Sequence, residues 1–463
     1  MRGARGCDSH AAKPLVVRSA LVLVLALGVA ASGAFVRERT AAAARGRSVA
    51  AVAEPATAMA DRGPARVKTW YYYGLNDVNA GVRPALMAAY ADYVEDDGFA
   101  AEHARAFKAA GGRFAGAYTD PAYVPYCRPP FAPPAGKCDG PLGNAGEGAW
   151  FHGRDGTRVR RYVDAHFQYQ EALNPLSPDA RRAWHAFTEG IVAKAPWLDF
   201  FFADDAGGPL HAGDMSPRSS EFYDFNEAGS EITSDEVFRD AWTGYLAQSV
   251  RPLVLNGYDP TSGLPAYGGA FLRPAFVWGE VHEGCFRGAG GLETERRDRW
   301  TVEEASLLAN TALRKLAVCF MMGSPTPPAR LYALASWWLG YDPQWSVMAP
   351  IDPVPGGSSL LPETELVPAY PLRTARSSAD ELRDATGVYV REFGRCYLRG
   401  VPAGPCAAFV NPTLRPLEMP RAAARYRHAL VLDDRDVPRG GRVSWTGPVP
   451  AILPASSALI LGG

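Results

Sequence analysis

The chain has 463 residues, a formal net charge of −1 and 21% charged residues. A nearly neutral chain has no basic field that could hold nucleic acid or an anionic membrane surface, so neither is expected as a partner. Hydrophobic residues make up 47% of the sequence, which excludes a disordered or fibrous chain and fits one large domain with a smaller one.

The first 36 residues have the pattern of an export signal. Basic residues up to Arg18 precede an apolar run over 19–35, which small residues close. The run is also close to the length that can span a bilayer, so an uncleaved membrane anchor is the alternative. Both readings place the rest of the chain outside the cytoplasm, as a secreted, periplasmic or surface-anchored protein. Residues 37–66 are rich in Ala, Arg and Pro and are predicted to be a disordered linker.

From residue 67, short apolar runs alternate with helical stretches, which predicts βα units around a parallel sheet. The predicted strands are 68–74, 113–118, 166–173, 198–203, 252–256, 275–283, 317–323 and 345–349. Eight such strands match an α/β fold of the (β/α)8 TIM-barrel type over 67–372. A seven-stranded or distorted barrel and a doubly wound open sheet are the alternatives, although no GxGxxG motif follows the first strand.

Helices are predicted between these strands. Ser177 is a good N-cap and Pro178 suits the first position of a helix over 179–194, and Thr301 with Glu304 forms a capping box that would open a later helix. The other predicted helices are 99–110, 235–249 and 329–339. From about residue 375, short runs recur every ten or so residues, which predicts a small C-terminal antiparallel β-sandwich domain over 373–463.

Six cysteines follow the export segment, and an even number in an exported chain favours disulfides. Cys127–Cys138 and Cys396–Cys406 are the preferred pairs, because each brackets a short segment. Cys285–Cys319 then follows by elimination. No Cys/His spacing indicates zinc, and neither a metal nor a cofactor is predicted.

Acidic residues stand at two predicted strand ends, where TIM barrels carry their reacting groups. Four apolar residues lead directly into Asp204 and Asp205. The later strand carries Glu280, His282 and Glu283, and strand alternation puts Glu280 and His282 on the face opposite Glu283. Glu283 is nearer the end, so we predict it as the reacting group. Glu280 is predicted to pair with an arginine. His282 is predicted to orient a neighbouring group or to fill space, rather than to react.

Two carboxylates on separate strands fit glycosidic cleavage. We predict Asp204 as the ionised nucleophile and Glu283 as the proton donor, with Asp205 in support. Asn256, at the end of the fifth predicted strand, can hydrogen-bond a sugar hydroxyl. Sugar-stacking candidates, each of which could equally fill the core, are Tyr72, Trp150 and Trp278.

Three stretches carry a family resemblance: LDFFFADD (198–205), PLVLNGY (252–258) and FVWGEVHEG (276–284). They resemble strand signatures of TIM-barrel glycoside hydrolases of the bacterial "hypothetical glycosyl hydrolase" type, related in pattern to endo-α-1,4-polygalactosaminidases. In those families one strand ends in Asp followed by Asp or Asn, which Asp204 matches, and a later one ends in Gly-x-x-x-Glu, which Gly279 to Glu283 match. The resemblance spans about 68–463 and implies two catalytic acids and a C-terminal β-domain.

The predicted function is therefore a glycosidase that cleaves O-glycosidic bonds of an extracellular poly- or oligosaccharide. Carbohydrate is the expected partner, and contact with a membrane is expected only through a possible N-terminal anchor. One alternative is a non-catalytic glycan-binding protein on a degenerate barrel, because fold does not fix function. Another is a metal-dependent polysaccharide deacetylase that uses Asp204, Asp205 and His211, although these residues form no recognised ligand motif.

Overall fold

The computed structural model describes residues 62–73, 79–96, 102–125, 142–152, 156, 158, 160–162, 169–206, 235–256, 271–286, 297–321 and 326–463. The export segment, the predicted pair Cys127–Cys138 and His211 lie outside these residues. Within them, no helix combines the length and the apolar character needed to cross a membrane.

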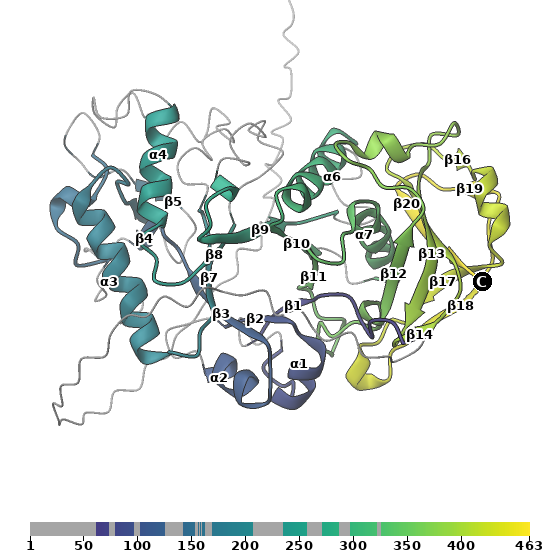
Figure 1. Cartoon of the computed structure of the whole chain (residues 1–463), viewed down its shortest axis with the longest axis horizontal. Coiled ribbons are helices and arrows are strands. Elements are labelled where there is room, and N and C mark those ends of the chain that lie inside the picture. Colours follow the sequence, from purple (N-terminus) through teal and green to yellow (C-terminus); the bar gives the residue numbers. More distant parts are fainter. Residues whose placement is uncertain are drawn as a thin grey trace, which may run out of the picture.

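The centre of the molecule is a barrel of eight parallel strands in the order β1-β2-β3-β7-β8-β9-β10-β11 (Figure 1). These strands are β1 (Trp70–Tyr72), β2 (Tyr93–Asp96), β3 (Phe114–Thr119), β7 (Phe200–Ala203), β8 (Leu253–Leu255), β9 (Val277–Glu283), β10 (Leu316–Met321) and β11 (Ser346–Pro350). A parallel bridge between Thr69 and Met348 closes the ring, and the Met348 N–H donates to the Lys68 carbonyl at 2.9 Å. The predicted TIM barrel is confirmed.

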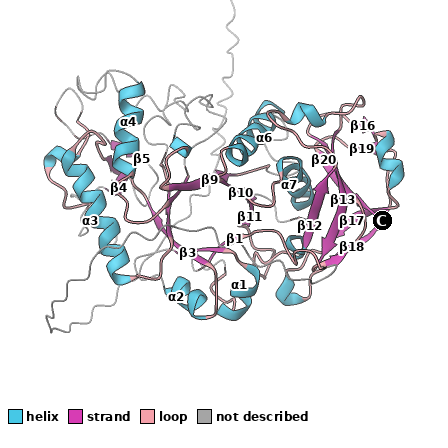
Figure 2. Cartoon of the chain, viewed as in Figure 1, coloured by secondary structure: helices cyan, strands magenta, loops and turns pink. Residues whose placement is uncertain are grey.

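Helices cover the outside of the barrel (Figure 2). They are α1 (Pro84–Tyr90), α2 (Glu102–Ala109), α3 (Pro178–Lys194), α4 (Asp235–Leu246), α6 (Arg297–Ala312) and α7 (Pro327–Gly340). Ser177 caps α3 as predicted, since its hydroxyl accepts from the N–H groups of Asp179 and Ala180. The predicted capping box is wrong: α6 begins at Arg297, so Thr301 and Glu304 lie inside the helix.

Two strand assignments also need correction. The predicted strand 166–173 contains β6 (Tyr169–Ala172), but β6 pairs with β4 (Tyr123–Pro125) and β5 (Arg160–Tyr162) in a separate antiparallel sheet. The barrel strand β2 was not predicted. Alternating apolar and polar residues identify a strand but not the sheet that it joins. One predicted barrel strand was therefore too many and one was missed, so the number of barrel strands and the order of the later ones were still predicted correctly.

The C-terminal region forms a seven-stranded antiparallel sheet. Its strands are β12 (Leu366–Pro371), β13 (Tyr389–Leu398), β14 (Val401–Pro402), β15 (Cys406–Asn411), β17 (His428–Leu432), β18 (Val443–Gly447) and β20 (Ser457–Gly462). One face packs against α7, which lies between the sheet and the barrel (Figure 1). A two-stranded sheet, β16 (Leu417–Glu418) with β19 (Ile452–Leu453), packs on the other face. The predicted sandwich is not confirmed, because a second full sheet is absent from the described residues.

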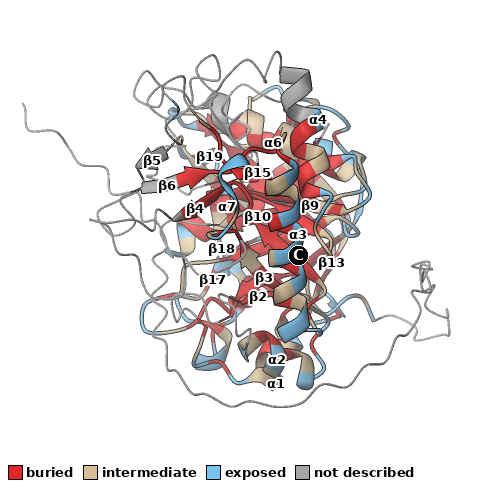
Figure 3. Cartoon of the chain, turned by 90° about the vertical axis from the view of Figure 1, so that its left-hand side faces the viewer, coloured by how far each residue is buried: buried red, intermediate tan, exposed pale blue. Residues whose placement is uncertain are grey.

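The barrel and the C-terminal sheet share one core. Trp337 and Trp338 of α7 are fully buried in a cluster that also contains residues of the sheet, and the strands of both parts are largely buried (Figure 3). Arg391 of β13 is 2% exposed and donates to the carbonyls of Trp338 and Leu339 at 2.9 and 2.7 Å. Its positive charge therefore meets the C-terminal end of α7, where the helix dipole is negative.

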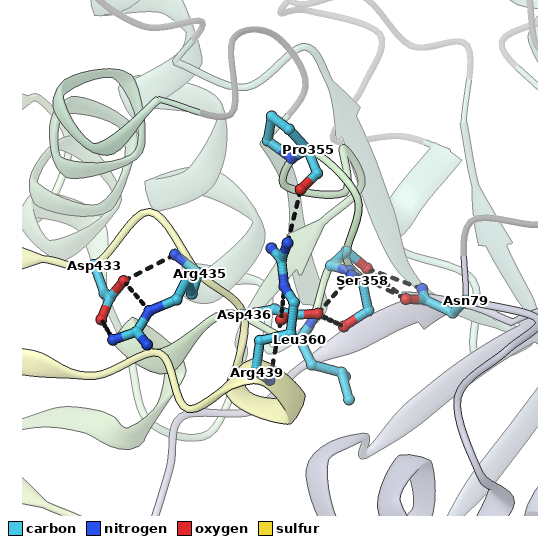
Figure 4. A network of polar contacts seen from close by, with 9 residues as sticks. Asn79, Pro355, Ser358, Leu360, Asp433, Arg435, Asp436 and Arg439 are labelled. Carbon is cyan, nitrogen blue, oxygen red and sulfur yellow. Dashed lines mark hydrogen bonds and ion pairs between the residues drawn. The ribbon is translucent and has the colours of Figure 1, made fainter.

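A polar network joins the loop after β11 to both parts (Figure 4). Asp436 accepts from the Ser358 N–H at 2.6 Å and from its hydroxyl at 2.7 Å. Asn79 accepts from the Ser359 N–H at 3.1 Å and donates to the Tyr72 carbonyl at 2.6 Å. The loop is thus fixed between the C-terminal region and the end of β1.

Two of the predicted disulfides are confirmed. Cys285–Cys319 and Cys396–Cys406 have Cα–Cα distances of 5.4 and 5.9 Å. The first joins the segment after β9 to β10, and the second joins β13 to β15. Disulfides of this kind are typical of oxidising compartments.

Candidate active site

Two acids and one amide meet at the carboxyl end of the barrel. Asp204 directly follows β7, Asn256 follows β8, and Glu283 is the last residue of β9. The Asn256 side-chain nitrogen donates to Asp204 Oδ1 at 2.9 Å and to Glu283 Oε2 at 3.2 Å. Since both oxygens lie near the same nitrogen, they are at most about 6 Å apart, so the two carboxyl groups are close neighbours. The structure therefore brings these three predicted residues together.

Asp204 is half-buried and accepts three hydrogen bonds. The Tyr118 hydroxyl donates to Oδ2 at 2.7 Å, and the Asp205 N–H donates to Oδ1 at 2.9 Å, beside the Asn256 bond. Asp205 has a φ of 48°, a left-handed conformation that Asp tolerates better than most residues. This turn folds the backbone N–H of Asp205 back onto the preceding carboxylate.

The environment of Asp204 favours its protonated form. Burial, followed by the negative charges of Asp205 and Glu283, raises the pKa of Asp204 to about 7, against the hydrogen bonds from Tyr118 and the Asp205 N–H, which lower it. We predicted Asp204 as the ionised partner of the pair. A raised pKa suits a proton donor better than the ionised role that we predicted.

Glu283 occupies the more open position of the pair, since its residue is exposed. Gly284 follows with a φ of 72°, so the chain turns sharply there. Cys285 then attaches the segment to β10 through its disulfide, and the Phe286 N–H donates to Glu303 at 2.8 Å. These contacts hold the end of β9 in place, where Glu283 is exposed and accepts from Asn256.

Glu280 and His282 lie on the opposite side of β9, as alternation predicted. Both are buried against α6, where the Asn310 amide nitrogen lies 2.9 Å from Glu280 and 2.8 Å from His282. The predicted arginine partner of Glu280 is wrong, because among the described residues the side chain that donates to Glu280 is that of Asn310. Burial raises the pKa of Glu280 to about 8. Neither residue reaches the carboxylate pair.

Two of the three aromatic candidates lie away from the acids. Trp278 stands at the start of β9 and packs on Phe114 and Phe200, at the amino end of the barrel. A bulge where β8 pairs with β9 shifts the register there and turns Trp278 into the barrel. Trp150 is 2% exposed, and the Arg158 guanidinium covers its ring at 4.3 Å. Stacking of either ring on a sugar is therefore a wrong prediction.

Tyr72 lies inside the barrel near the acids. Its ring packs on Phe202 and Phe320, with centroid distances of 6.3 and 5.2 Å, and it is 7% exposed. Burial, followed by the charges of Glu95, Glu283 and Asp204, raises the pKa of Tyr72 well above its usual range. The Tyr72 ring therefore packs in the interior of the barrel against Phe202 and Phe320.

Sequence reasoning missed two residues of the site. Tyr118 belongs to β3, and the alternation that points Phe114 inward also points Tyr118 inward, so this signal was available. Glu95 belongs to β2, a strand that was not predicted, and it is fully buried inside the barrel. β2 is only four residues long and two of them are acids, so its sequence shows no clear strand pattern.

Among the described residues, no group of three or more His, Cys, Asp or Glu side chains is arranged to hold a metal ion. The deacetylase alternative also requires His211, which lies outside them.

No family model matches the chain. No curated protein matches it either. Among solved structures, the catalytic domain of β-amylase from Paenibacillus polymyxa is similar at 9% sequence identity, with a TM-score of 0.35, over 62% of this chain and 93% of that one. At this level of likeness we infer function from the residues of the site alone.

Proposed function

We propose that the chain is a glycoside hydrolase that cleaves O-glycosidic bonds of a poly- or oligosaccharide with Asp204 and Glu283. The main support is the amide of Asn256, which bridges carboxylates from two different strands at the catalytic end of a TIM barrel. Glycosidases need one protonated and one ionised carboxyl group on either side of the scissile bond. The unequal burial of Asp204 and Glu283 supplies such a difference.

Asp204 is the proton donor in this proposal, and Glu283 is the ionised group. Asp204 gives its proton to the glycosidic oxygen, the bond from C1 to that oxygen breaks, and the electron pair leaves with the oxygen. Glu283 stabilises the positive charge that develops on the sugar ring. This order reverses the roles that we predicted from the sequence, because the more buried acid holds its proton longer.

The spacing of the acids favours retention of configuration. Carboxyl groups lie about 5–5.5 Å apart in retaining enzymes and about 6.5–9.5 Å apart in inverting ones. The limit of about 6 Å between the bridged oxygens fits the closer pair. Glu283 would then form a bond to C1. In the second step, water gives a proton to Asp204, its oxygen bonds to C1, and the bond from C1 to Glu283 breaks.

The roles can be tested with leaving groups of different basicity. The wild type would be screened against oligosaccharides and against 2,4-dinitrophenyl glycosides, whose phenolate leaves without a proton. In Asp204→Ala, kcat should fall about 10²–10⁴-fold on oligosaccharides and much less on the dinitrophenyl substrate. Glu283→Ala should lose activity on both. With azide, Glu283→Ala should yield a glycosyl azide of inverted configuration, and Asp204→Ala one of retained configuration.

Asp199→Asn is the matched control, because Asp199 lies at the other end of β7 and accepts from the Lys108 ammonium and the Ala115 N–H. Its activity should stay within twofold of the wild type. A wild type that binds oligosaccharides without cleaving any would contradict the proposal and favour a glycan-binding protein. Equal losses for both variants on both substrates would contradict the assigned roles.

The substrate is expected outside the cytoplasm. The two disulfides support this location, since such bonds persist mainly in oxidising compartments.

A further inference from the structure

A tyrosine hydroxyl, that of Tyr118, is bonded directly to the proposed proton donor. It donates to Asp204 Oδ2 at 2.7 Å. The Tyr118 side chain points into the barrel, where its ring packs on Phe202 with a centroid distance of 5.7 Å. This packing limits the movement of the ring, so the barrel wall fixes where the hydroxyl lies.

The backbone holds the tyrosine and the acid in the same relation. Tyr118 and Phe202 are direct partners in the parallel register of β3 and β7. The Asp204 N–H donates to the Thr119 carbonyl at 2.8 Å, and the Thr119 hydroxyl donates to the Phe202 carbonyl at 2.9 Å. The end of β3 therefore fixes Asp204 through its backbone as well as through its side chain.

The two oxygens of Asp204 have different partners. Oδ1 accepts from two N–H groups, that of Asp205 at 2.9 Å and that of the Asn256 amide at 2.9 Å. Oδ2 accepts from the Tyr118 hydroxyl alone among the described residues. Each carboxyl oxygen has two acceptor sites, so Oδ1 is fully occupied by donors that cannot accept a proton in return. The one site left for a proton on this carboxyl group is on Oδ2.

We propose that Tyr118 is a positioning residue that makes Oδ2 of Asp204 the atom from which the proton is delivered and stabilises the charge left on that atom. This inference rests on the glycosidase function proposed above. In the reaction the bond from Oδ2 to hydrogen breaks, the proton goes to the glycosidic oxygen, and the electron pair stays on Oδ2. The tyrosine hydroxyl then donates to an ionised oxygen, and hydrogen bonds of that kind are stronger than neutral ones. The bond therefore stabilises the transition state more than the ground state.

The test is Tyr118→Phe, which removes the hydroxyl and keeps the ring that packs on Phe202. The readout is kcat/KM, which reports the steps up to the cleavage of the glycosidic bond. On oligosaccharides it should fall about 10–100-fold, the effect expected for the loss of one hydrogen bond to a charged group. On 2,4-dinitrophenyl glycosides it should change by less than about threefold, because the phenolate leaves without a proton.

The pH dependence gives a second readout that a merely structural role would not move. The Tyr118 hydrogen bond lowers the pKa of Asp204, whereas burial and the charges of Asp205 and Glu283, which stay in the variant, raise it. Loss of the donor therefore raises the pKa of Asp204 further. Since the acid must be protonated to act, the alkaline limb of kcat/KM on oligosaccharides should move to higher pH in Tyr118→Phe.

Tyr389→Phe is the matched control, because the Tyr389 hydroxyl also donates to an aspartate, Asp380 Oδ1, at 2.7 Å, but in the C-terminal region. Its kcat/KM should stay within about twofold of the wild type on both substrates, with an unchanged alkaline limb.

Three results for Tyr118→Phe would overturn the inference while an active wild type leaves the proposed function intact. They are an unchanged kcat/KM on oligosaccharides, equal losses on both substrates, and an alkaline limb that stays in place or moves to lower pH. A wild type that cleaves no glycoside would overturn both proposals.

Discussion

The raised pKa of Asp204 makes a prediction about folding that requires no substrate. Replacement by Asn removes the titration and keeps the shape, because Oδ1 can still accept from Asn256 and the Asp205 N–H while the new amide donates to the Tyr118 oxygen. We expect Asp204→Asn to become more stable relative to the wild type as the pH rises. The reason is that the wild type must ionise a carboxyl group in a site that disfavours the charge.

The magnitude follows from the change of pKa between the unfolded and the folded chain. In the folded chain the pKa of Asp204 is about 7, against 3.8 ordinarily. A raised pKa gives a contribution to stability that is fully present below about pH 4 and is lost progressively until the pH passes about 7. At about 1.4 kcal/mol per pKa unit this is about 4 kcal/mol, and solvent at the half-buried side chain reduces the expected change to about 2 kcal/mol.

The assay is urea unfolding followed by tryptophan fluorescence, in steps from pH 4 to pH 8.5. The difference in free energy of unfolding between Asp204→Asn and the wild type should grow between about pH 4 and pH 7 and then stay constant. Asp204→Ala should follow the same pH dependence with a constant loss, since it also removes the hydrogen bonds. A difference that is flat across this range, or that shrinks as the pH rises, would refute the assignment of Asp204 as the proton-holding acid.

Two further predictions concern the structure that supports the site. Arg391→Met removes the donor to the last carbonyls of α7 and the positive charge that lowers the pKa of Glu304. The free energy of unfolding should therefore fall by about 3 kcal/mol. A loss below 1 kcal/mol in urea unfolding would contradict this role. Replacing Cys285 and Cys319 together by Ser opens a loop of 34 residues and should cost about 3–4 kcal/mol, and a wild type with equal stability with and without reductant would argue against that bond.

Strand ends that follow an apolar run were predictable from the sequence. Asp204 follows four consecutive buried residues, and a strand covered on both faces has no other reason to lead into two acids. Glu283 and His282 could also be assigned to opposite faces, because side-chain alternation is a local property of any strand. The alternation failed only at Trp278, where the bulge depends on the pairing of β8 with β9, which the sequence of β9 alone does not contain.

The depth of each residue was not predictable. Glu95 lies in a four-residue strand with an acid on each face, a pattern that a solvent-exposed turn would share. Only the closed barrel, which brings Trp70 and Tyr72 alongside, turns that acid into a buried acceptor. Glu304 was taken for a capping residue for the same reason. The positive charge that acts on Glu304 belongs to Arg391, which lies in β13, far along the chain.

The division of roles between Asp204 and Glu283 depends on this depth as well. Both acids stand at strand ends in the sequence, so position alone gave no physical basis for ranking their pKa values. In the fold, Asp204 lies against Tyr118 within the ring, whereas Glu283 stands at its exposed rim. Asn256 between them donates to both and adds no charge, so it holds two acids close together without fixing which one carries the proton. The difference in burial then decides where the proton stays.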